Sequence, residues 1–557
     1  MVGESRIVSS LEKVFCCSNF NGKTLDCISA LRGERVSFQI ALRLDSCASL
    51  EVEAIVPENF TGNITFREVD MVPSLLPAVR EDPYVISVEP GLFPDPLKPL
   101  DKPMAVTDNN WHSIWVSADI PESAAPGVYK LKFALKCTSR YVHTLWCKEP
   151  FLDLEESIDF EIFDALLPEQ ELKVTHWFHA DCIQHFYHVS AWSEEYWTLL
   201  EKYFRNFAQH HSNMLLTPLW GLPLDLIPGK TTRPVCQLLK ISFDNGKWTF
   251  NFDRLVRWIT TAKRCGIKNF EMVHAFSQWG LKYAPEIKVD VAGREQSFFG
   301  KDCSSQSPEY REFLCALMKE LLVVLRENGL NEKNCYFHIS DEPALEHLEN
   351  YRYASELFRE ILDGFPVIDA LSRIEYLKEG LIERPVPGEA ELDEFLTEEV
   401  TERWVYYAGE WRDGMPGRQF GMPSLRNRVL GILLYVYDCK GFLEWGYNYW
   451  FSQFNRTWDV DPWSDTNSER SFRSGGAYLV YPGPDGPVDS LRHEVVAEGI
   501  RDEMALRALE SKTSREAVLK FLDDETGYRI NLRKYPRSEE WLLELRRKIN
   551  MKLAELS

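Results

Sequence analysis

The segment SPEYREFLCALMKELLVVLRENGLNEKNCYFHISDEP, residues 307–343, shows the pattern that decides the fold of the larger part of this chain. Its first part spaces apolar residues like one face of an amphipathic helix and stops at Gly329, a frequent residue just beyond a helix C-terminus. The short apolar run at 335–340 then predicts a buried strand. Asp341 and Glu342 follow directly, and Pro343 prevents the strand from continuing. The segment therefore predicts a helix, a strand and two adjacent carboxylates at the carboxyl end of that strand.

The same alternation of short apolar runs and amphipathic helices continues through most of the chain. The predicted strands are residues 174–179, 213–218, 269–276, 335–340, 365–371, 381–387, 403–408 and 441–450. Repeated units of strand and helix predict a (β/α)8 barrel over residues 169–510. A doubly wound sheet is the alternative, but no GxGxxG motif opens any of the predicted helices.

The remaining parts of the chain have different patterns. Residues 1–168 alternate apolar and polar side chains, as in ERVSFQIALRL (34–44), with Pro and Gly clusters between such runs. Short strands at this spacing predict an N-terminal antiparallel β-sandwich. The charged stretch SEEWLLELRRKINMKLAEL (538–556) predicts a helix, so residues 511–557 are expected to form a helical extension packed on the barrel. The predicted fold class is therefore multi-domain, with β and α/β parts.

Composition and charge exclude several classes of partner. The chain of 557 residues contains 85 Asp and Glu against 63 Lys and Arg, a formal net charge of −22. Because nucleic acids and acidic membrane surfaces attract clustered Lys and Arg, neither is a predicted partner. No run approaches the ~18 apolar residues of a membrane span. Aromatic residues make up 13% of the chain, which suits a sugar-binding cleft as well as a large core.

The cysteines and the first residues suggest a compartment. The 13 cysteines are odd in number and show no CxxC or zinc-like spacing, as expected for free thiols in a reducing cytosol. The start MVGESRIVSS lacks the basic and then apolar pattern of an export signal. We therefore expect a cytoplasmic protein; no pattern in the sequence predicts its oligomeric state.

The chemistry is expected where barrel strands end, because barrel active sites form at the carboxyl ends of the strands. Asp341 and Glu342 meet this condition, whereas the Asp-Glu pairs at 393–394, 502–503 and 524–525 do not. They are the predicted catalytic residues. The same condition selects aromatic and amide side chains that suit a pyranose pocket. These predicted substrate-binding residues are His176, Trp177, His274, Tyr406, Tyr407, Trp445, Tyr447 and Asn448, with Trp411 further along.

Other catalytic constellations find little support. The stretch HADCIQHFYH (179–188) contains potential metal ligands, but its interleaved aromatic residues suit a loop and helix start better, and the chain has no HExxH motif. The segment 227–232 lacks the first glycine of a phosphate-binding loop, and no GxSxG motif is present. We therefore predict neither a metal nor a cofactor.

The larger half of the chain resembles glycoside hydrolase family 123, a family of β-N-acetylgalactosaminidases in which a β-sandwich precedes the catalytic barrel. The resemblance rests on FHADC (178–182), HISDEP (338–343), GFLEWGYNYW (441–450) and the stretches 406–435 and 475–503. It extends over about residues 175–505 and implies a glycan or glycoside as substrate.

The resemblance implies an exo-acting enzyme that releases terminal β-linked N-acetylgalactosamine with retention of configuration. In this family the 2-acetamido oxygen of the sugar attacks the anomeric carbon, and no protein nucleophile is used. Asp341 is then expected to orient the acetamido group and stabilise the oxazolinium charge, while Glu342 acts as general acid and then as base. The adjacent Asp341 carboxylate should favour the protonated form of Glu342, so that the two titrate as a coupled pair.

Roles for the surrounding residues follow from the same resemblance. By analogy with the hexosaminidases of family 20, Tyr407 is expected to bind the acetamido oxygen, with Tyr406 as the alternative. Trp445 is the expected floor of the pocket, and Asn448 and His274 are expected to bind hydroxyl groups. Since many secreted relatives carry export signals and this chain shows none, imported small glycans are the expected substrates.

Two alternative functions stay open at this point. A β-hexosaminidase with another sugar preference fits the same motifs, because the sequence does not place the residue that reads the 4-hydroxyl group. A glycan-binding protein with little activity on the same scaffold is the other alternative. The intact Asp341–Glu342 pair counts against the latter, since a site without catalytic function is free to lose its acid.

Overall fold

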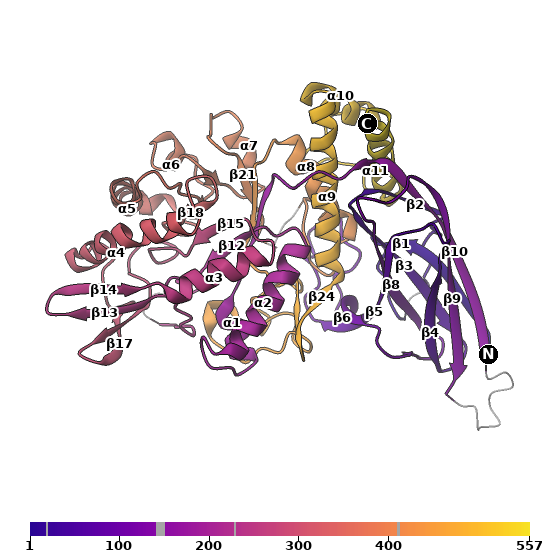
Figure 1. The fold of residues 1–557 in the computed structure, drawn as a ribbon, viewed down its shortest axis with the longest axis horizontal. Coiled ribbons are helices and arrows are strands. Elements are labelled where there is room, and N and C mark those ends of the chain that lie inside the picture. The colour runs from indigo at the N-terminus through magenta and orange to yellow at the C-terminus, as the bar shows by residue number, and fades with distance from the viewer. Residues whose placement is uncertain (18–19, 141–150, 228–229, 409–412) are drawn as a thin grey trace.

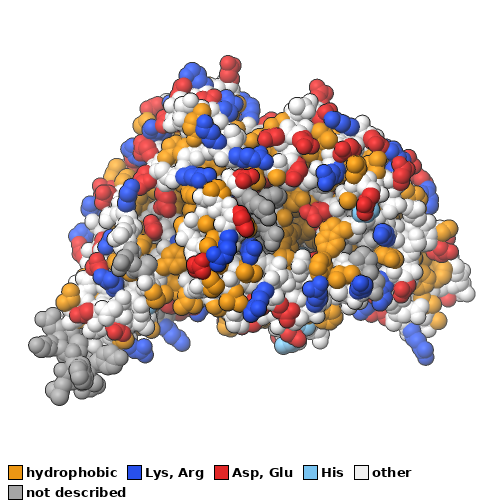
Figure 2. All heavy atoms as spheres, turned by 180° about the vertical axis from the view of Figure 1, so that it is seen from behind, with side chains coloured by type: hydrophobic (Ala, Val, Ile, Leu, Met, Phe, Trp, Pro, Cys, Tyr) orange, Lys and Arg blue, Asp and Glu red, His pale blue; other side chains and the backbone are white. Residues whose placement is uncertain are grey.

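The computed structural model describes residues 1–17, 20–140, 151–227, 230–408 and 413–557. A β-sandwich that contains the N-terminus lies beside a larger α/β half, and the C-terminal helices cover the junction between them (Figure 1). The opposite face is hollowed near its centre and carries acidic and basic side chains interspersed over its surface (Figure 2). Among the helices in the described ranges, none combines the length and apolar character needed to cross a bilayer.

The sandwich consists of two sheets around a common core. Their strand orders are β1-β3-β8-β5-β6-β24-β23 and β2-β10-β9-β4-β7. The strands are β1 Gly3–Ser9, β2 Cys27–Arg32, β3 Arg35–Leu44, β4 Ala48–Ile55, β5 Asn63–Ser74, β6 Gly91–Pro99, β7 Met104–Val106, β8 Trp111–Asp119, β9 Gly127–Ser139, β10 Phe151–Leu166, β23 Tyr481–Gly483 and β24 Gly486–Ser490. Along β9 every second side chain is buried, because only one face of the strand meets the core. Phe38, Phe133 and Phe160 contribute to this core from both sheets.

The pairing of these strands differs from the predicted antiparallel sandwich in two respects. β2 pairs with β10 in parallel, while the other pairs in these two sheets are antiparallel. In addition, β23 and β24 come from the α/β half of the chain, and β24 pairs with β6 at the edge of the first sheet. The sheet therefore crosses the predicted boundary at residue 168.

Eight short strands form the frame of the α/β half. They are β11 Lys173–His176, β12 Met214–Thr217, β15 Asn269–Met272, β18 Cys335–Phe337, β19 Asp369–Ala370, β20 Pro385–Val386, β21 Trp404–Tyr406 and β22 Gly441–Glu444. Parallel pairing joins β11-β22-β21, β12-β15-β18 and β19-β20 into three small sheets. Single parallel bridges, Phe337↔Val367 and Gly388↔Tyr406, connect neighbouring sheets. The first of these strands thus pairs with the last, and the others pair in chain order.

Helices and one extra sheet surround these strands. The helices are α1 Ala180–Phe186, α2 Glu194–Gln209, α3 Asp253–Arg264, α4 Pro308–Glu327, α5 Leu348–Ile361, α6 Glu375–Lys378, α7 Leu392–Phe395 and α8 Ser424–Val436. The extra sheet contains β13 Lys240–Asp244, β14 Lys247–Asn251, β16 Ile287–Val291 and β17 Arg294–Phe299. In α4 the Ser307 side chain caps the first turn by accepting a hydrogen bond from Tyr310 N–H. The helix predicted within residues 307–343 is therefore confirmed as α4, and the strand predicted at 335–340 is present as β18 but ends at Phe337.

The three C-terminal helices are α9 Leu491–Lys512, α10 Arg515–Thr526 and α11 Glu539–Glu555. α11 packs against α9 and also against β2 and β10 of the sandwich. Arg546 on α11 pairs with Glu34 of the sandwich and with Asp502 on α9. The C-terminal extension therefore contacts both halves, and not the α/β half alone as expected.

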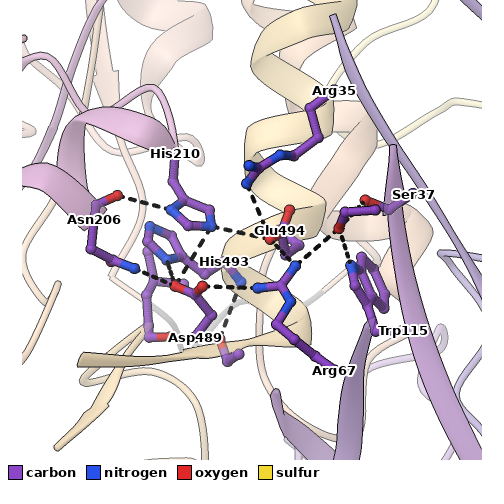
Figure 3. Close-up of polar contacts among 12 residues, drawn as sticks. Arg35, Ser37, Arg67, Trp115, Asn206, His210, Asp489, His493 and Glu494 are labelled. Atoms are coloured by element: carbon purple, nitrogen blue, oxygen red, sulfur yellow. Dashed lines mark hydrogen bonds and ion pairs between the residues drawn. The ribbon is translucent and has the colours of Figure 1, made fainter. Parts of the chain in front are cut away.

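A buried ion network joins the sandwich to β24 and α9. Arg67 on β5 donates hydrogen bonds to Asp489 Oδ2 (2.8 Å) and to Glu494 Oε1, and Arg35 lies 3.9 Å from the same Glu494 oxygen. Figure 3 shows the guanidinium groups of Arg35 and Arg67 directed at these carboxylates. Only 1% of the Glu494 side chain is exposed, so the arginines replace the water that the carboxylate loses on folding.

Two histidines complete the network from the α/β side. The rings of His210 and His493 stack with centroids 3.8 Å apart, and Nε2 of His210 lies 3.3 Å from Glu494 Oε1 (Figure 3). Burial alone would raise the pKa of Asp489, but His210, His493 and Arg67 together lower it. Burial would likewise lower the pKa of His210, yet Asp489 and Glu494 raise it. The junction is thus a cluster of mutually stabilised buried charges.

Candidate active site

A cavity of about 350 Å³ opens where the strands of the α/β half end. It is lined by Trp177, His179, Leu224, Asp225, Arg233, Gln278, Trp279, Asp341, Glu342, Ala370, Tyr406, Ala408, Leu443, Trp445, Tyr449, Gln453, Ser471 and Phe472. These residues come from the ends of several strands and from the loops that follow them, as barrel active sites do. Both predicted catalytic residues face this one cavity.

A second cavity, of about 420 Å³, lies between the sandwich and α8, α9 and α11. Its wall includes Arg428 and Arg546, which form ion pairs with Glu498 and Glu34. It is larger than the first cavity, but its charged side chains hold the two halves of the molecule together. The chemistry is therefore expected in the smaller cavity, where two carboxylates lie side by side.

The two carboxylates of the smaller cavity have different surroundings. Asp341 is 5% exposed, and its Oδ2 accepts a 2.5 Å hydrogen bond from the Gln278 amide. Glu342 is exposed at the cavity mouth, where its Oε1 accepts a 2.7 Å hydrogen bond from Tyr406 and its Oε2 a 3.3 Å bond from Trp279 Nε1. One acid is therefore held in the wall and the other at the opening.

Burial raises the pKa of Asp341 well above its usual value, and the neighbouring Glu342 carboxylate adds to this rise. His338 and the hydrogen bond from Gln278 act in the opposite direction. The sequence predicted coupled titration of the pair, with Asp341 as the ionised member. Burial and repulsion by Glu342 instead favour a proton on Asp341.

A buried imidazolium lies close to this pair. His338, at the end of β18, contacts Glu271 through Nε2 (2.8 Å) and Asp369 through Nδ1 (3.3 Å). Burial disfavours its charge, but these two carboxylates raise the pKa of His338 to about 9. The His274 ring stacks on it at 4.3 Å. His338 thus supplies a fixed positive charge near Asp341.

Three residues that line the cavity have a strained backbone conformation. Positive φ angles occur at Asp225 (54°), Trp279 (54°) and Glu342 (45°). Non-glycine residues in this region of φ/ψ space are costly and cluster at functional sites. At Glu342 the strain is held by a hydrogen bond from its backbone N–H to Ala370 O (2.8 Å). The strained conformation turns two adjacent side chains toward the same space.

Three of the predicted binding residues line the cavity together with the acid pair: Trp177 after β11, Tyr406 at the end of β21 and Trp445 after β22. Trp445 forms part of an aromatic wall, since its ring lies 5.2 Å from that of Tyr449 and 5.1 Å from that of Phe472. These side chains lie as the strand-end argument predicted.

Tyr407, His176 and His274 do not line the cavity. Tyr407 is next to Tyr406 and His176 is next to Trp177, and both of these neighbours line the cavity. Because successive side chains of an extended chain point to opposite sides, Tyr407 and His176 point away from it. The Tyr407 hydroxyl is buried without a partner among the described residues, and His176 Nδ1 bonds Ser212 Oγ (2.9 Å). The predicted contact of Tyr407 with substrate therefore does not fit the observed register.

Tyr447 and Asn448 also lie outside the cavity wall, because β22 ends at Glu444 and the chain turns beyond it. The Tyr447 hydroxyl donates to Asn206 Oδ1 (2.7 Å). The Asn448 side chain brackets the backbone of His179, with hydrogen bonds of 2.8 and 3.0 Å to its N–H and C=O. Asn448 thus positions a cavity residue rather than facing the cavity. Trp411 lies outside the described residues.

Several cavity residues were missed from the sequence. Gln278 and Trp279 lie two and three residues after the predicted strand 269–276, so the strand-end argument could have found them. Asp225 and Arg233 belong to a long loop after β12, where periodicity carries no signal. Tyr449 lies in the motif at 441–450, but the sequence does not show that it faces the cavity, where its hydroxyl donates to Asp225 Oδ2 (2.6 Å).

The potential metal ligands form internal ion pairs. Asp181 accepts hydrogen bonds from Arg233 at 2.6 and 2.9 Å, and the same guanidinium contacts His179. Within the described part of the chain, two further groups lie close enough to share an ion: His210, Asp489 and His493, and His274, His338 and Asp369. In each group the carboxylate already faces a protein cation, namely Arg67 for Asp489 and His338 for Asp369.

Adjacent carboxylates at the carboxyl ends of parallel strands, in a cavity walled by aromatic rings, are the arrangement of a glycoside hydrolase. The chain belongs to glycoside hydrolase family 123. The model described as "Glycoside hydrolase 123, catalytic domain" matches residues 177–509, and "Glycoside hydrolase 123 N-terminal domain" matches residues 21–137. The family predicted from the sequence motifs is thus confirmed.

A solved structure of a family 123 enzyme agrees at the level of the fold. A family 123 glycoside hydrolase from Clostridium perfringens, described for glycolipid glycan hydrolysis, superposes on 100% of this chain and 97% of its own, with a TM-score of 0.72 and 15% identity. More distant are a Bifidobacterium dentium β-glucuronidase (TM-score 0.32, 10% identity, 90% of this chain and 66% of that chain) and an Eisenbergiella tayi β-galacturonidase (0.31, 11%, 90% and 98%). No significant match exists among curated proteins.

Proposed function

We propose that this protein is a retaining, exo-acting β-N-acetylgalactosaminidase that uses the 2-acetamido group of its substrate as the nucleophile. The observation that carries the proposal is the pair Asp341 and Glu342, which face one cavity with different surroundings. Substrate assistance needs two acids close together, one to hold the acetamido group and one to exchange protons. A buried acid beside an exposed one suits these two roles.

In the first step the acetamido carbonyl oxygen attacks C1, and the bond from C1 to the glycosidic oxygen breaks. Glu342 gives its proton to the leaving oxygen, which keeps the electron pair of the broken bond. Asp341 accepts a hydrogen bond from the acetamido N–H and stabilises the positive charge of the oxazolinium ion. Binding of this N–H favours the ionised form of Asp341, because a hydrogen bond to a charged form stabilises it.

In the second step Glu342 acts as a base. It takes a proton from a water molecule whose oxygen attacks C1, and the bond from C1 to the acetamido oxygen breaks. The acetamido group is restored, and two inversions at C1 give net retention. Tyr406 orients Glu342 through its 2.7 Å hydrogen bond, and Trp445 offers an apolar face to the sugar ring. The exposed position of Glu342 leaves room for the aglycone outside the cavity.

We further infer that the α/β half is a (β/α)8 barrel over residues 169–510, followed by the helical extension. Support comes from the parallel pairing of β11 with β22 and of neighbouring strands in chain order, partly through single bridges. Such a barrel collects strand-end residues at one rim, which is where the acid pair and Tyr406 lie.

The test is hydrolysis of an aryl β-N-acetylgalactosaminide, with the N-acetylglucosaminide and the unacetylated galactoside as comparison substrates. The proposal expects cleavage of the first, weaker cleavage of the second and none of the third, since the galactoside has no internal nucleophile. Preference for the glucosaminide would indicate a hexosaminidase of different specificity. Cleavage of the galactoside would exclude substrate assistance, and inactivity on all three with binding of sugar would indicate a glycan-binding protein.

A further inference from the structure

We propose that Asp225 determines the sugar preference of the cavity by accepting a hydrogen bond from the 4-hydroxyl group of the bound residue. The proposal rests on the function proposed above and adds a residue that the mechanism leaves unassigned. Asp225 lies in the loop after β12, in the wall of the same cavity as the acid pair. It is a third carboxylate of the site with no part in proton transfer.

The backbone holds Asp225 in a fixed place. Its N–H donates a 2.5 Å hydrogen bond to Gln278 Oε1, and its carbonyl oxygen accepts one of 2.6 Å from Asn455 Nδ2. Its φ of 54° is a left-handed conformation that a non-glycine residue adopts only when its surroundings impose it. The strain and both backbone contacts therefore set the direction of the carboxylate.

The carboxylate uses only one of its oxygens within the protein. Oδ2 accepts hydrogen bonds from the Tyr449 hydroxyl (2.6 Å) and from Phe454 N–H (2.7 Å). Oδ1 accepts none from any residue that the structure describes, although Asp225 lines the cavity. A purely structural role in the loop is complete with Oδ2, so Oδ1 is left to receive a hydroxyl group from the cavity.

The order of side chains along the wall matches the order of groups around a 2-acetamido sugar. Trp279 and Glu342 are in contact, the Gln278 amide N–H donates to the Asp341 carboxylate, and the Gln278 amide oxygen accepts from the backbone N–H of Asp225. The sequence along the wall is thus Glu342, Asp341, Gln278 and Asp225. In the proposed mechanism the leaving oxygen at C1 faces Glu342, and the acetamido group at C2 faces Asp341. Asp225 then falls beyond C3, beside C4.

A neighbouring cation completes a site for a hydroxyl group. Arg233 lies over the Tyr449 ring at 5.7 Å and also lines the cavity. Two of its nitrogens bond Asp181, whereas Nη1 makes only a 3.5 Å contact with Leu224 O. A hydroxyl that donates to Asp225 Oδ1 accepts from such an N–H, and each bond polarises the other. The cavity is thereby suited to a hydroxyl in one orientation at C4.

The experiment compares aryl β-N-acetylgalactosaminide with its 4-deoxy analogue in the wild type, Asp225→Ala and Asp225→Asn. Asp225→Asn keeps the size of the side chain, and Asp244→Ala at the exposed end of β13 is the matched control. In the wild type and the control, loss of the 4-hydroxyl should lower kcat/KM by about 10- to 100-fold, as expected for a hydrogen bond to a charged group. Asp225→Ala should lose a similar factor on the parent substrate, and Asp225→Asn, which keeps an acceptor oxygen without the charge, should lose a smaller one. On the deoxy analogue, neither variant should be much slower than the wild type.

Each result decides the proposal. Circular dichroism shows whether the Asp225 variants are folded. If loss of the 4-hydroxyl lowers kcat/KM as much in the folded variants as in the wild type, the role of Asp225 is overturned, while the proposed hydrolysis stands. Calorimetric titration with N-acetylgalactosamine and its 4-deoxy form measures sugar affinity without turnover. It therefore distinguishes failure of the role of Asp225 from failure of the proposed hydrolysis. If the wild type shows no hydrolysis but its affinity for the sugar depends on the 4-hydroxyl and on Asp225, this inference holds and the proposed hydrolase function is refuted. Absence of both binding and turnover refutes both.

Discussion

Replacement of Arg67 by Met should strongly destabilise the protein through the junction between its halves. Arg67 is 15% exposed and bonds Asp489, Glu494 and Ser117 Oγ (3.1 Å). Each hydrogen bond to a carboxylate is worth about 1.5–3 kcal/mol, and the one to the serine about 1 kcal/mol. Arg35 and His210 stay near Glu494 and compensate part of the loss. The expected decrease in the free energy of unfolding is therefore about 3–5 kcal/mol, typical of a broken buried ion pair.

The measurement is urea unfolding followed by far-UV circular dichroism at pH 7. Arg80→Met is the matched control, because Arg80 and Glu89 are 64% and 70% exposed and such pairs are worth less than about 1 kcal/mol. Adding Glu494→Gln to the Arg67 variant should restore part of the loss, since one buried unpaired charge disappears. Equal unfolding free energies for the Arg67 and Arg80 variants would refute the assigned role of the network.

The pH dependence of the same variant provides an independent check. Burial would raise the pKa of Glu494, but Arg67 and His210 hold it well below its usual value. Its stabilising contribution is therefore complete above the unfolded pKa of about 4.3 and is lost as the pH falls below it. The difference between wild type and Arg67→Met should shrink as the pH decreases through this range.

Three further predictions concern the cavity. Glu342→Gln should lower kcat/KM on a natural glycoside by about 10²- to 10⁴-fold but retain more activity on a nitrophenyl glycoside, whose leaving group needs no proton; equal losses on both would contradict the general acid role. Asp341→Asn should slow both substrates, yet raise the free energy of unfolding at pH 7 by about 1 kcal/mol or more, because burial makes the charge of Asp341 costly. That gain should vanish near pH 3, where the wild-type carboxyl is protonated in both states, and urea unfolding at the two pH values measures it. Tyr406→Phe should lower kcat by about tenfold with little change in KM, whereas Tyr407→Phe, which removes a hydroxyl outside the cavity, should retain wild-type kinetics.

The sequence contained enough information to place the acid pair. Residues 307–343 combine a capped helix, a buried strand and two acids, and each of these signals is local. The strand-end argument also found Tyr406 and Trp445. It could not choose between Tyr406 and Tyr407, because β21 has only three residues and a shift of one position exchanges the two faces.

Features that depend on distant parts of the chain could not be predicted. Asp225 belongs to a long loop whose position is set by Gln278, Tyr449 and Asn455. The pairing of β24 with β6 joins segments far apart in the sequence, so no local periodicity announces it. The ionisation of Asp341 depends on its burial, which adjacency to Glu342 alone does not reveal.

The pairing of β24 with β6 has a practical consequence for anyone who divides this protein. A fragment ending near residue 168 would expose the free edge of β6, and unpaired strand edges promote aggregation. A fragment beginning there would leave the β23–β24 hairpin without its neighbour and Asp489 without Arg67. The family's two matched regions are therefore better treated as one unit for expression, and truncations that remove either half are expected to yield insoluble or unstable protein.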